Sequence, residues 1–179
     1  MSVSPVFRTQ SRSATATRWR VFYTRPRAEK AVRDRLAHAG HDVLLIEREV
    51  LRQWSDRKKK VREPLFPGYL FARVDERARL AVLEDVGVVK TVSFGSRIAA
   101  VPDTDMEALR QLQSVPERLE AVALDAAPVG SEVIVTNGPL KGLRALVSGH
   151  PKPLYLLLHV HAIRQAVRVH VPADWVMRV

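Results

Sequence analysis

The spacing of apolar residues changes near residue 115, and this change most limits how the chain can fold. Before it, strand-like segments alternate with segments of helical spacing. After it, residues 129–179 hold short strand-like segments separated by turns such as Asn137-Gly138-Pro139. Strands that alternate with helices predict helices packed on a sheet, whereas closely spaced short strands predict a small β-barrel. The sequence therefore predicts two domains of different fold class.

Four segments are expected along the 179 residues. They are a disordered basic tail, an α+β domain with a mostly antiparallel sheet, a linker with proline at both ends, and the β-barrel, at residues 1–18, 19–115, 116–128 and 129–179. The tail is rich in Ser, Thr and Arg and lacks an apolar run, which is unlike a secretory signal.

In the α+β domain, aromatic and β-branched runs predict strands, and apolar residues three or four apart predict helices. The expected strands are Arg18–Thr24, Val43–Leu51, Leu65–Val74 and Val88–Phe94, and the expected helices are 26–39, Glu76–Asp85 and 103–112. The basic segment Trp54–Arg62 is predicted to be a hairpin tip. In the third helix, Glu107 follows Thr104 by the three residues that are typical of a capping box.

In the C-terminal domain, strands are expected at Glu132–Thr136, Gly142–Ser148, Leu154–Ile163 and Val167–Val171. The segment Leu154–Val167 can be interpreted as strand or as helix. Apolar residues at 156, 160, 163 and 167 form a stripe at helical spacing, although the local composition favours strands. Periodicity alone does not decide between them.

Charge indicates what kind of partner the chain binds. It has 29 Lys and Arg against 19 Asp and Glu, a formal net charge of +10. Such an excess favours polyanions such as nucleic acid or an anionic membrane surface, and the alternative is a basic protein without such a partner. No apolar run approaches the roughly 20 residues that cross a bilayer, so no membrane association is expected. The absence of cysteine excludes disulfides and is compatible with a reducing compartment.

Catalytic constellations are not evident. His159 and His161 would share one face of a strand, but no Asp or Glu lies between Glu132 and Asp174 to supply a third metal ligand nearby. The sequence also lacks a phosphate-binding loop, a nucleophile elbow and a dinucleotide-binding fingerprint. We therefore expect a protein that is not an enzyme and has no metal or cofactor.

Two motifs resemble the NusG family of transcription factors. The first is Glu63–Phe71 (EPLFPGYLF), with Trp19 before it and Phe94-Gly95 after it. The second is Gly130–Val135 followed by Asn137–Gly142, which resembles the KOW motif that opens the family's C-terminal barrel. The resemblance covers roughly residues 19–179. It implies a monomeric, cytoplasmic transcription elongation or antitermination factor that suppresses pausing or termination.

Within the family, the chain is more similar to the specialised RfaH branch than to the housekeeping factor. Glu63–Phe71 and the Leu-rich Leu154–Leu158 carry this likeness, as does Val101-Pro102 soon after Phe94-Gly95. The likeness implies that the barrel can also refold as a helical hairpin. Two departures argue against borrowing the branch's DNA specificity and its second polymerase contact. They are Asp85-Val86 in place of Thr-Arg, and Arg79–Val82 in place of a His-Thr-Thr stretch.

The resemblance also implies site residues. Tyr23, Phe66, Tyr69 and Phe71 match the apolar region that grips the clamp helices of the largest subunit of RNA polymerase. Aromatic anchors commonly dominate such interfaces. Because strand residues alternate between faces, some of these side chains are core residues, and we expect Tyr69 and Phe71 at the interface and Trp19 in the core.

Basic residues of the first helix and its entry are expected to face the single non-template DNA strand. They are Arg25, Arg27, Lys30, Arg33, Arg35 and His38. The alternative is a solvated helix face. The run Arg57–Lys60, with Arg62, is a second candidate patch, which we interpret as a hairpin tip more than as a DNA reader.

The C-terminal barrel of this family recruits a further factor, such as a small-subunit ribosomal protein or the terminator Rho. In the RfaH branch, a carboxylate at the position of Glu63 pairs with a basic residue of the barrel domain. Lys152 is the nearest candidate here. The competing hypothesis is a KOW-containing module that binds the ribosome or RNA.

Overall fold

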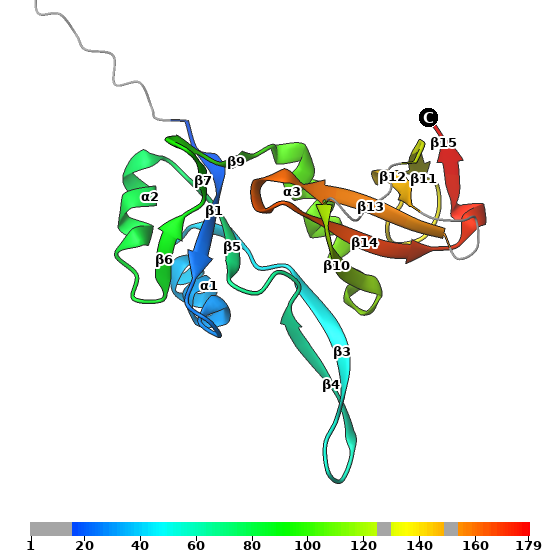
Figure 1. Cartoon of the computed structure of the whole chain (residues 1–179), viewed down its shortest axis with the longest axis horizontal. Coiled ribbons are helices and arrows are strands. Elements are labelled where there is room, and N and C mark those ends of the chain that lie inside the picture. Colours follow the sequence, from blue (N-terminus) through cyan, green and yellow to red (C-terminus); the bar gives the residue numbers. More distant parts are fainter. Residues whose placement is uncertain (1–15, 125–129, 149–153) are drawn as a thin grey trace, which may run out of the picture.

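The structure, a computed structural model, describes residues 16–124, 130–148 and 154–179. An N-terminal half of helices and strands is followed by a C-terminal half of strands (Figure 1). The N-terminal half contains β1 (Arg18–Thr24), α1 (Glu29–His38), β2 (Asp42–Leu44), β3 (Glu47–Gln53), β4 (Lys58–Pro64), β5 (Tyr69–Val74), α2 (Glu76–Leu83), β6 (Val88–Thr91), β7 (Ser93–Phe94), β8 (Arg97–Ile98), β9 (Ala100–Val101) and α3 (Asp103–Leu112).

The described part of the C-terminal half contains 3-10 helices and strands. They are η1 (Pro116–Arg118), β10 (Leu119–Ala123), β11 (Glu132–Val135), β12 (Arg144–Ser148), β13 (Leu154–Val160), η3 (His161–Ile163), β14 (Gln165–Val171), η4 (Ala173–Trp175) and β15 (Val176–Arg178). Of these strands, β13 and β14 are the longest. The strands form one antiparallel sheet in the order β10-β14-β13-β12-β11-β15. The expected barrel is therefore an all-antiparallel β region in the structure.

The N-terminal sheet has the order β2-β5-β1-β6, and β9 also pairs with β1. All of its pairings are antiparallel, as the sequence predicts. The central strand β1 is rich in aromatic and β-branched residues, and its side chains alternate between the two faces. Trp19 and Val21 enter one buried cluster, and Phe22 enters another on the opposite face.

Both faces of this sheet are covered. On one face, Val32 and Leu36 of α1 and Val82 of α2 pack against the sheet. On the other face lie Met106, Leu109 and Leu112 of α3, which are also buried. Each helix is amphipathic, so burying its apolar face against the sheet stabilises both elements.

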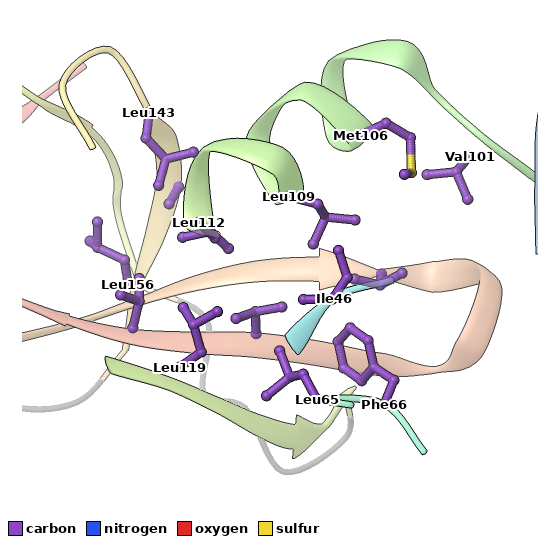
Figure 2. Packing of buried hydrophobic residues seen from close by; sticks show 14 of the residues in the cluster. Ile46, Leu65, Phe66, Val101, Met106, Leu109, Leu112, Leu119, Leu143 and Leu156 are labelled. Carbon is purple, nitrogen blue, oxygen red and sulfur yellow. The ribbon is translucent and has the colours of Figure 1, made fainter. Parts of the chain in front are cut away.

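Helix α3 joins the two halves of the molecule. Its buried leucines share one cluster with Leu143 and Leu156 of the C-terminal half (Figure 2). The side chain of Gln111 donates to the carbonyl of Lys141 across this contact, at 2.8 Å. The two halves therefore share a continuous apolar core in this structure.

Several expected elements differ in detail. The predicted strand Val43–Leu51 is split into β2 and β3, because Leu45 and Ile46 between them are buried in opposite clusters. The predicted third strand begins only at Tyr69, since the Pro67-Gly68 turn precedes β5. Much of the predicted tip belongs to strand β4.

Two further expectations need correction, and one open alternative is decided in this structure. The linker prediction 116–128 is wrong for its first part, because Leu119–Ala123 pairs with β14 and carries the buried Leu119. The capping box is absent, because α3 begins at Asp103 and its N-cap Pro102 makes no side-chain cap. The segment interpreted as strand or as helix contains the strand β13 in this structure. Residues 1–15 of the predicted tail lie outside the described residues.

Candidate functional site

Two tyrosines form a partly exposed aromatic pair at the end of the N-terminal sheet. Tyr23 of β1 and Tyr69 of β5 are register partners, and their rings meet edge to face with centroids 5.4 Å apart. They lie on the same sheet face as the buried Val21 and Phe71. Both rings remain half-buried, so the face that is closed elsewhere is open here.

A tight turn before β5 positions this pair. Gly68 has φ +82°, and a Cβ there would lie 2.8 Å from Cε2 of Tyr23. Only glycine combines this backbone conformation with so close an approach. The amide of Gly68 donates to Oε1 of the buried Glu29 at 2.8 Å, and its carbonyl accepts from the amide of Thr24 at 2.8 Å. Helix α1 therefore fixes the turn through Glu29.

Two depressions flank Tyr23. The larger, of about 570 Å³, lies between the turn, the start of α1 and the base of the β3–β4 hairpin. Its lining includes the prolines Pro26, Pro64 and Pro67. The smaller, of about 400 Å³, is lined by Tyr23, Tyr69, Lys90, Val92 and Ser93. A ligand in the larger depression could contact Tyr23 beside charged side chains such as Arg27 and Glu63, whereas a ligand in the smaller one could contact both tyrosine rings.

The other two predicted interface aromatics are core residues. Phe66 is 1% exposed and Phe71 is 0% exposed. The prediction placed one set of alternating side chains in the core and the other at the interface, with Tyr69 and Phe71 favoured for the interface, whereas buried clusters lie on both faces of the sheet and enclose Phe71. Phe66, with Leu65, packs beside β13 and β14 in the cluster that the two halves share (Figure 2). Trp19 is buried, as predicted.

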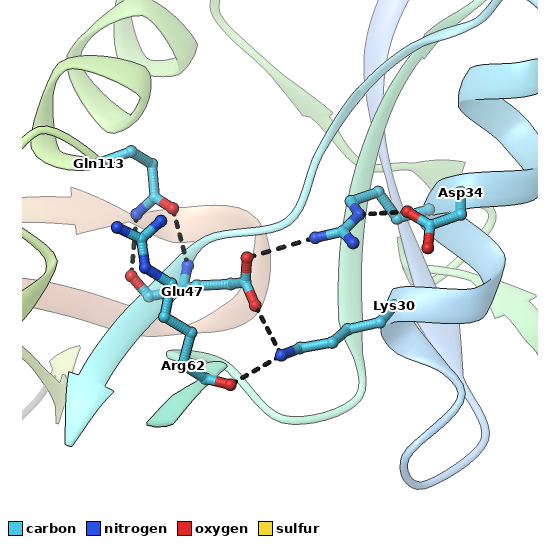
Figure 3. Close-up of polar contacts among 6 residues, drawn as sticks. Lys30, Asp34, Glu47, Arg62 and Gln113 are labelled. Carbon is cyan, nitrogen blue, oxygen red and sulfur yellow. Dashed lines mark hydrogen bonds and ion pairs between the residues drawn. The ribbon is translucent and has the colours of Figure 1, made fainter. Parts of the chain in front are cut away.

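The predicted DNA-binding residues fall into two groups. Among the described residues, the side chains of Arg25, Arg27 and His38 are exposed and have no ion-pair partner. Lys30 and Arg33 instead pair with Glu47 at the base of β3, at 3.0 and 3.2 Å (Figure 3). Lys30 also donates to the carbonyl of Arg62, at 2.7 Å (Figure 3).

Glu47 is the centre of this polar cluster, and the sequence does not predict it. Its backbone amide and carbonyl bond the side-chain amide of Gln113, both at 3.0 Å (Figure 3). The hydrogen bond with Asp34 and the charge of Asp34, followed by the charge of Glu47, raise the pKa of Arg33. The cluster ties α1, the hairpin and the end of α3 together.

Arg35, the last of the predicted DNA-binding arginines, is engaged by Asp85. Two hydrogen bonds of 2.7 Å join the guanidinium to both carboxylate oxygens. This contact, with the amide of Gly87, holds the pKa of Asp85 below its usual value. Asp85 was identified in the sequence as a departure from the RfaH pattern, but its partner lies 50 residues away in the chain.

The predicted interdomain pair joins Glu63 to Lys152, and among the described residues the ion-pair partners of Glu63 lie within its own hairpin. Its carboxylate pairs with Arg48 at 2.8 Å and Arg52 at 2.6 Å, both on the neighbouring strand of the same hairpin. These hydrogen bonds, that of Arg52 first, lower the pKa of Glu63. Lys152 lies outside the described residues.

His159 of β13 and His161 of η3 lie close together. The rings of His159 and His161 are 5.5 Å apart, and burial, then the neighbouring His161, lowers the pKa of His159. Within residues 16–124, 130–148 and 154–179, no group of three or more His, Asp or Glu residues could hold a metal ion. The same residues contain no helix long and apolar enough to cross a membrane.

An aromatic pair thus lies beside basic side chains on an α+β domain that is joined to an antiparallel β region. The chain belongs to the NusG family of transcription factors, because the family profile described as transcription termination factor nusG matches residues 17–110, more than half of its length. Transcription factors of this family are non-enzymatic.

A structure that concerns domain interaction in Thermotoga maritima NusG is 22% identical and has a TM-score of 0.49, covering 91% of this chain and 97% of that chain. A structure of the MjSpt4:Spt5 complex is 17% identical and has a TM-score of 0.31, covering 90% of this chain and 96% of that chain. No curated protein matches this chain.

Proposed function

We propose that this protein is a transcription elongation or antitermination factor that binds the clamp helices of the largest RNA polymerase subunit through Tyr23 and Tyr69. The observation that carries the proposal is the half-buried tyrosine pair, opened on a sheet face that is otherwise closed. Aromatic rings offer large contact area with few side-chain torsions to immobilise. The Gly68 turn, bonded to Glu29, orients both rings before any partner arrives.

The C-terminal half controls how much of this surface is available. Leu65 and Phe66 belong to the apolar cluster that both halves share, so they become accessible only when the halves separate. Polymerase binding would then use the tyrosine pair first and Phe66 after separation. The released antiparallel sheet would be free to recruit a second factor, such as a ribosomal protein or Rho.

The exposed side chains at the entry to α1 would contact the non-template DNA strand. Arg25, Arg27 and His38 have no ion-pair partner among the described residues, which supports this role. Positive side chains track phosphates, with affinity that falls as salt rises. Lys30, Arg33 and Arg35 would contribute less, because carboxylates engage them.

Membership of the specialised RfaH branch is the finer proposal. The motif Glu63–Phe71 and the Leu-rich strand β13 support it. So does the apolar stripe at helical spacing within 154–167, which is compatible with a helical alternative to β13. Circular dichroism of residues 116–179, alone and within the full chain, tests the switch. Equal strand content in both, after subtraction of the N-terminal half, would remove the helical alternative.

The experiment for polymerase binding is a pull-down of bacterial RNA polymerase by the full chain. Tyr23→Ala should weaken capture at least about tenfold, as truncating an interface aromatic commonly does. Tyr155→Ala is the matched control, because this half-buried tyrosine lies on β13, away from the proposed surface. Equal capture by all three proteins would refute the assignment, and recovery of ribosomal RNA without polymerase would favour the alternative KOW module.

Separation of the halves has its own test. The chain contains no cysteine, so Gln111→Cys and Lys141→Cys can be joined by a short thiol-reactive cross-linker. Cross-linked protein should capture less polymerase than the same variant before cross-linking. Unchanged capture would show that the closed arrangement already exposes the full binding surface.

A further inference from the structure

The β3–β4 hairpin projects away from the rest of the molecule (Figure 1). Seven residue pairs connect its strands, from Glu47 opposite Pro64 to Gln53 opposite Lys58. At the usual rise per residue the ribbon is roughly 20 Å long. All residues from Leu51 to Lys60 are exposed, so the outer half of this two-stranded ribbon has no cover from the rest of the chain.

Charge is unevenly distributed along this ribbon. The acidic residues Glu47, Glu49 and Glu63 lie at its base, where ion pairs engage all three. Residues 52–62 hold six basic side chains and one acidic one. The outer half is therefore strongly positive, while the base is nearly neutral.

Most of the outer basic side chains are free to bind a ligand. Among the described residues, no carboxylate lies within ion-pair distance of Arg57, Lys58, Lys59 or Arg62. Paired residues of an antiparallel ribbon share a face, so Lys59, opposite Arg52, lies on one face and Lys58, opposite Gln53, lies on the other. Positive charge therefore occupies both faces of the ribbon.

Apolar surface adds to this charge at the tip. Trp54 is 56% exposed, and Leu51 is 61% exposed. The backbone amide of Trp54 donates to the carbonyl of Arg57 at 2.8 Å, which closes the turn and holds the indole at the end of the ribbon. Trp54 is thus a large aromatic side chain exposed at the tip of a positive hairpin, and packing in the core does not account for its presence there.

We infer that the outer half of the β3–β4 hairpin, residues 52–62, binds double-helical DNA by entering its major groove. The groove is about 12 Å wide and admits a two-stranded β-ribbon. The groove is about 8.5 Å deep, which is less than the length of the hairpin. The tip of the hairpin can therefore reach the edges of the nucleobases while the end near Glu47 stays outside the groove.

The distribution of charge favours a duplex over a single strand. Phosphates flank a groove on two sides, which matches a ribbon that is positive on both faces. A single strand would present one line of phosphates, which suits a charged groove on one surface. Trp54 would contact base edges and thymine methyl groups at the floor of the groove. The contact needs no polymerase, so it is separate from the function proposed above.

Fluorescence anisotropy with the full chain tests the inference. The probes are a blunt, mixed-sequence duplex of roughly 20 base pairs, which is about two helical turns, and one of its strands alone. The variant Arg57→Gln/Lys58→Gln/Lys59→Gln should bind the duplex at least about tenfold more weakly. The slope of log affinity against log salt should become shallower by about 3, because each lost phosphate contact removes about 0.9.

A matched control separates the hairpin from overall charge. Arg77→Gln/Arg144→Gln/Arg178→Gln removes the same three charges from exposed positions away from the hairpin. This control should keep the duplex affinity within about threefold and keep the salt slope within about 1 of the unmodified chain. Circular dichroism and thermal melts of both variants establish that they fold.

Three results would overturn the inference. The first is equal loss of duplex affinity in the hairpin variant and the control. The second is tighter binding of the single strand than of the duplex by the unmodified chain. The third is a loss of about tenfold in single-strand affinity on Trp54→Ala with duplex affinity unchanged, which would indicate base stacking in place of groove binding.

Discussion

The guanidinium of Arg35 and the carboxylate of Asp85 form two parallel hydrogen bonds of 2.7 Å each. They connect helix α1 to the loop that follows α2. Asp85 also accepts from the amide of Gly87 at 2.8 Å, so it holds the loop as well as the arginine. Because Asp85 engages the guanidinium of Arg35, this cation is less available to the proposed DNA-binding surface.

Release of Arg35 should strengthen single-strand binding. Arg35→Gln should change single-stranded DNA affinity less than Arg27→Gln does, because Asp85 already engages Arg35. Asp85→Asn should raise that affinity about twofold to fivefold, because it frees one phosphate contact. Anisotropy at fixed salt measures all three variants. A larger loss for Arg35→Gln than for Arg27→Gln would contradict the account.

The bond from the Gly68 amide to the buried Glu29 should stabilise the turn that carries Tyr69. Glu29→Ala leaves a buried amide without its acceptor and should lower the free energy of unfolding by about 2 kcal/mol. Glu29→Gln retains an acceptor oxygen and should cost less than about 1 kcal/mol. Urea unfolding measures both values. Equal losses for the two variants would show that the hydrogen bond is not what stabilises the turn.

Two glycines of the C-terminal half form a matched pair for a stability test. Gly138 and Gly142 both have positive φ, +77° and +89°. A Cβ at Gly138 would overlap the ring of Trp175, whereas a Cβ at Gly142 would meet nothing within 4 Å. Gly142→Ala should cost about 1 kcal/mol from backbone strain alone. Gly138→Ala should cost about 3 kcal/mol, because overpacking adds to the strain.

Thermal melts of the two alanine variants give the comparison. The larger loss should be accompanied by a change in the environment of Trp175, visible in near-ultraviolet circular dichroism. A Gly142→Ala loss equal to or greater than that of Gly138→Ala would mean that Trp175 does not pack on this turn.

His159 should make stability depend on pH. Burial and the adjacent His161 lower its pKa in the folded protein, so the unfolded chain binds this proton more readily. Stability is therefore full above the ordinary histidine value of about 6.5 and falls as pH decreases below it. His159→Gln should flatten the decrease in melting temperature between about pH 7 and pH 5. An unchanged pH dependence in this variant would assign the effect to other groups.

Local sequence patterns predicted the elements that are determined by their own residues and not by a distant partner. The aromatic, β-branched run Arg18–Thr24 is strand β1 with the same limits. The alanine-rich Leu119–Ala123 was predicted as linker, because its partner strand β14 lies more than 40 residues later and no local signal announces it.

Site residues were predictable to a similar extent. The motif Glu63–Phe71 identified the region of the tyrosine pair. Residue alternation could not show that both faces of the sheet are covered, and for this reason it did not predict that Phe66 and Phe71 are both buried. The engagement of Arg35 by Asp85 depends on the tertiary fold, since 50 residues separate the two.

The most direct test of the central claim is an in vitro elongation assay with bacterial RNA polymerase on a template that contains a pause site and a terminator. The unmodified chain should shorten the pause or reduce termination. Tyr69→Ala should lose most of this effect, at least about tenfold in the concentration required, while Tyr155→Ala should retain it. No change in pausing or termination with the unmodified chain, or equal activity of Tyr69→Ala, would contradict the account.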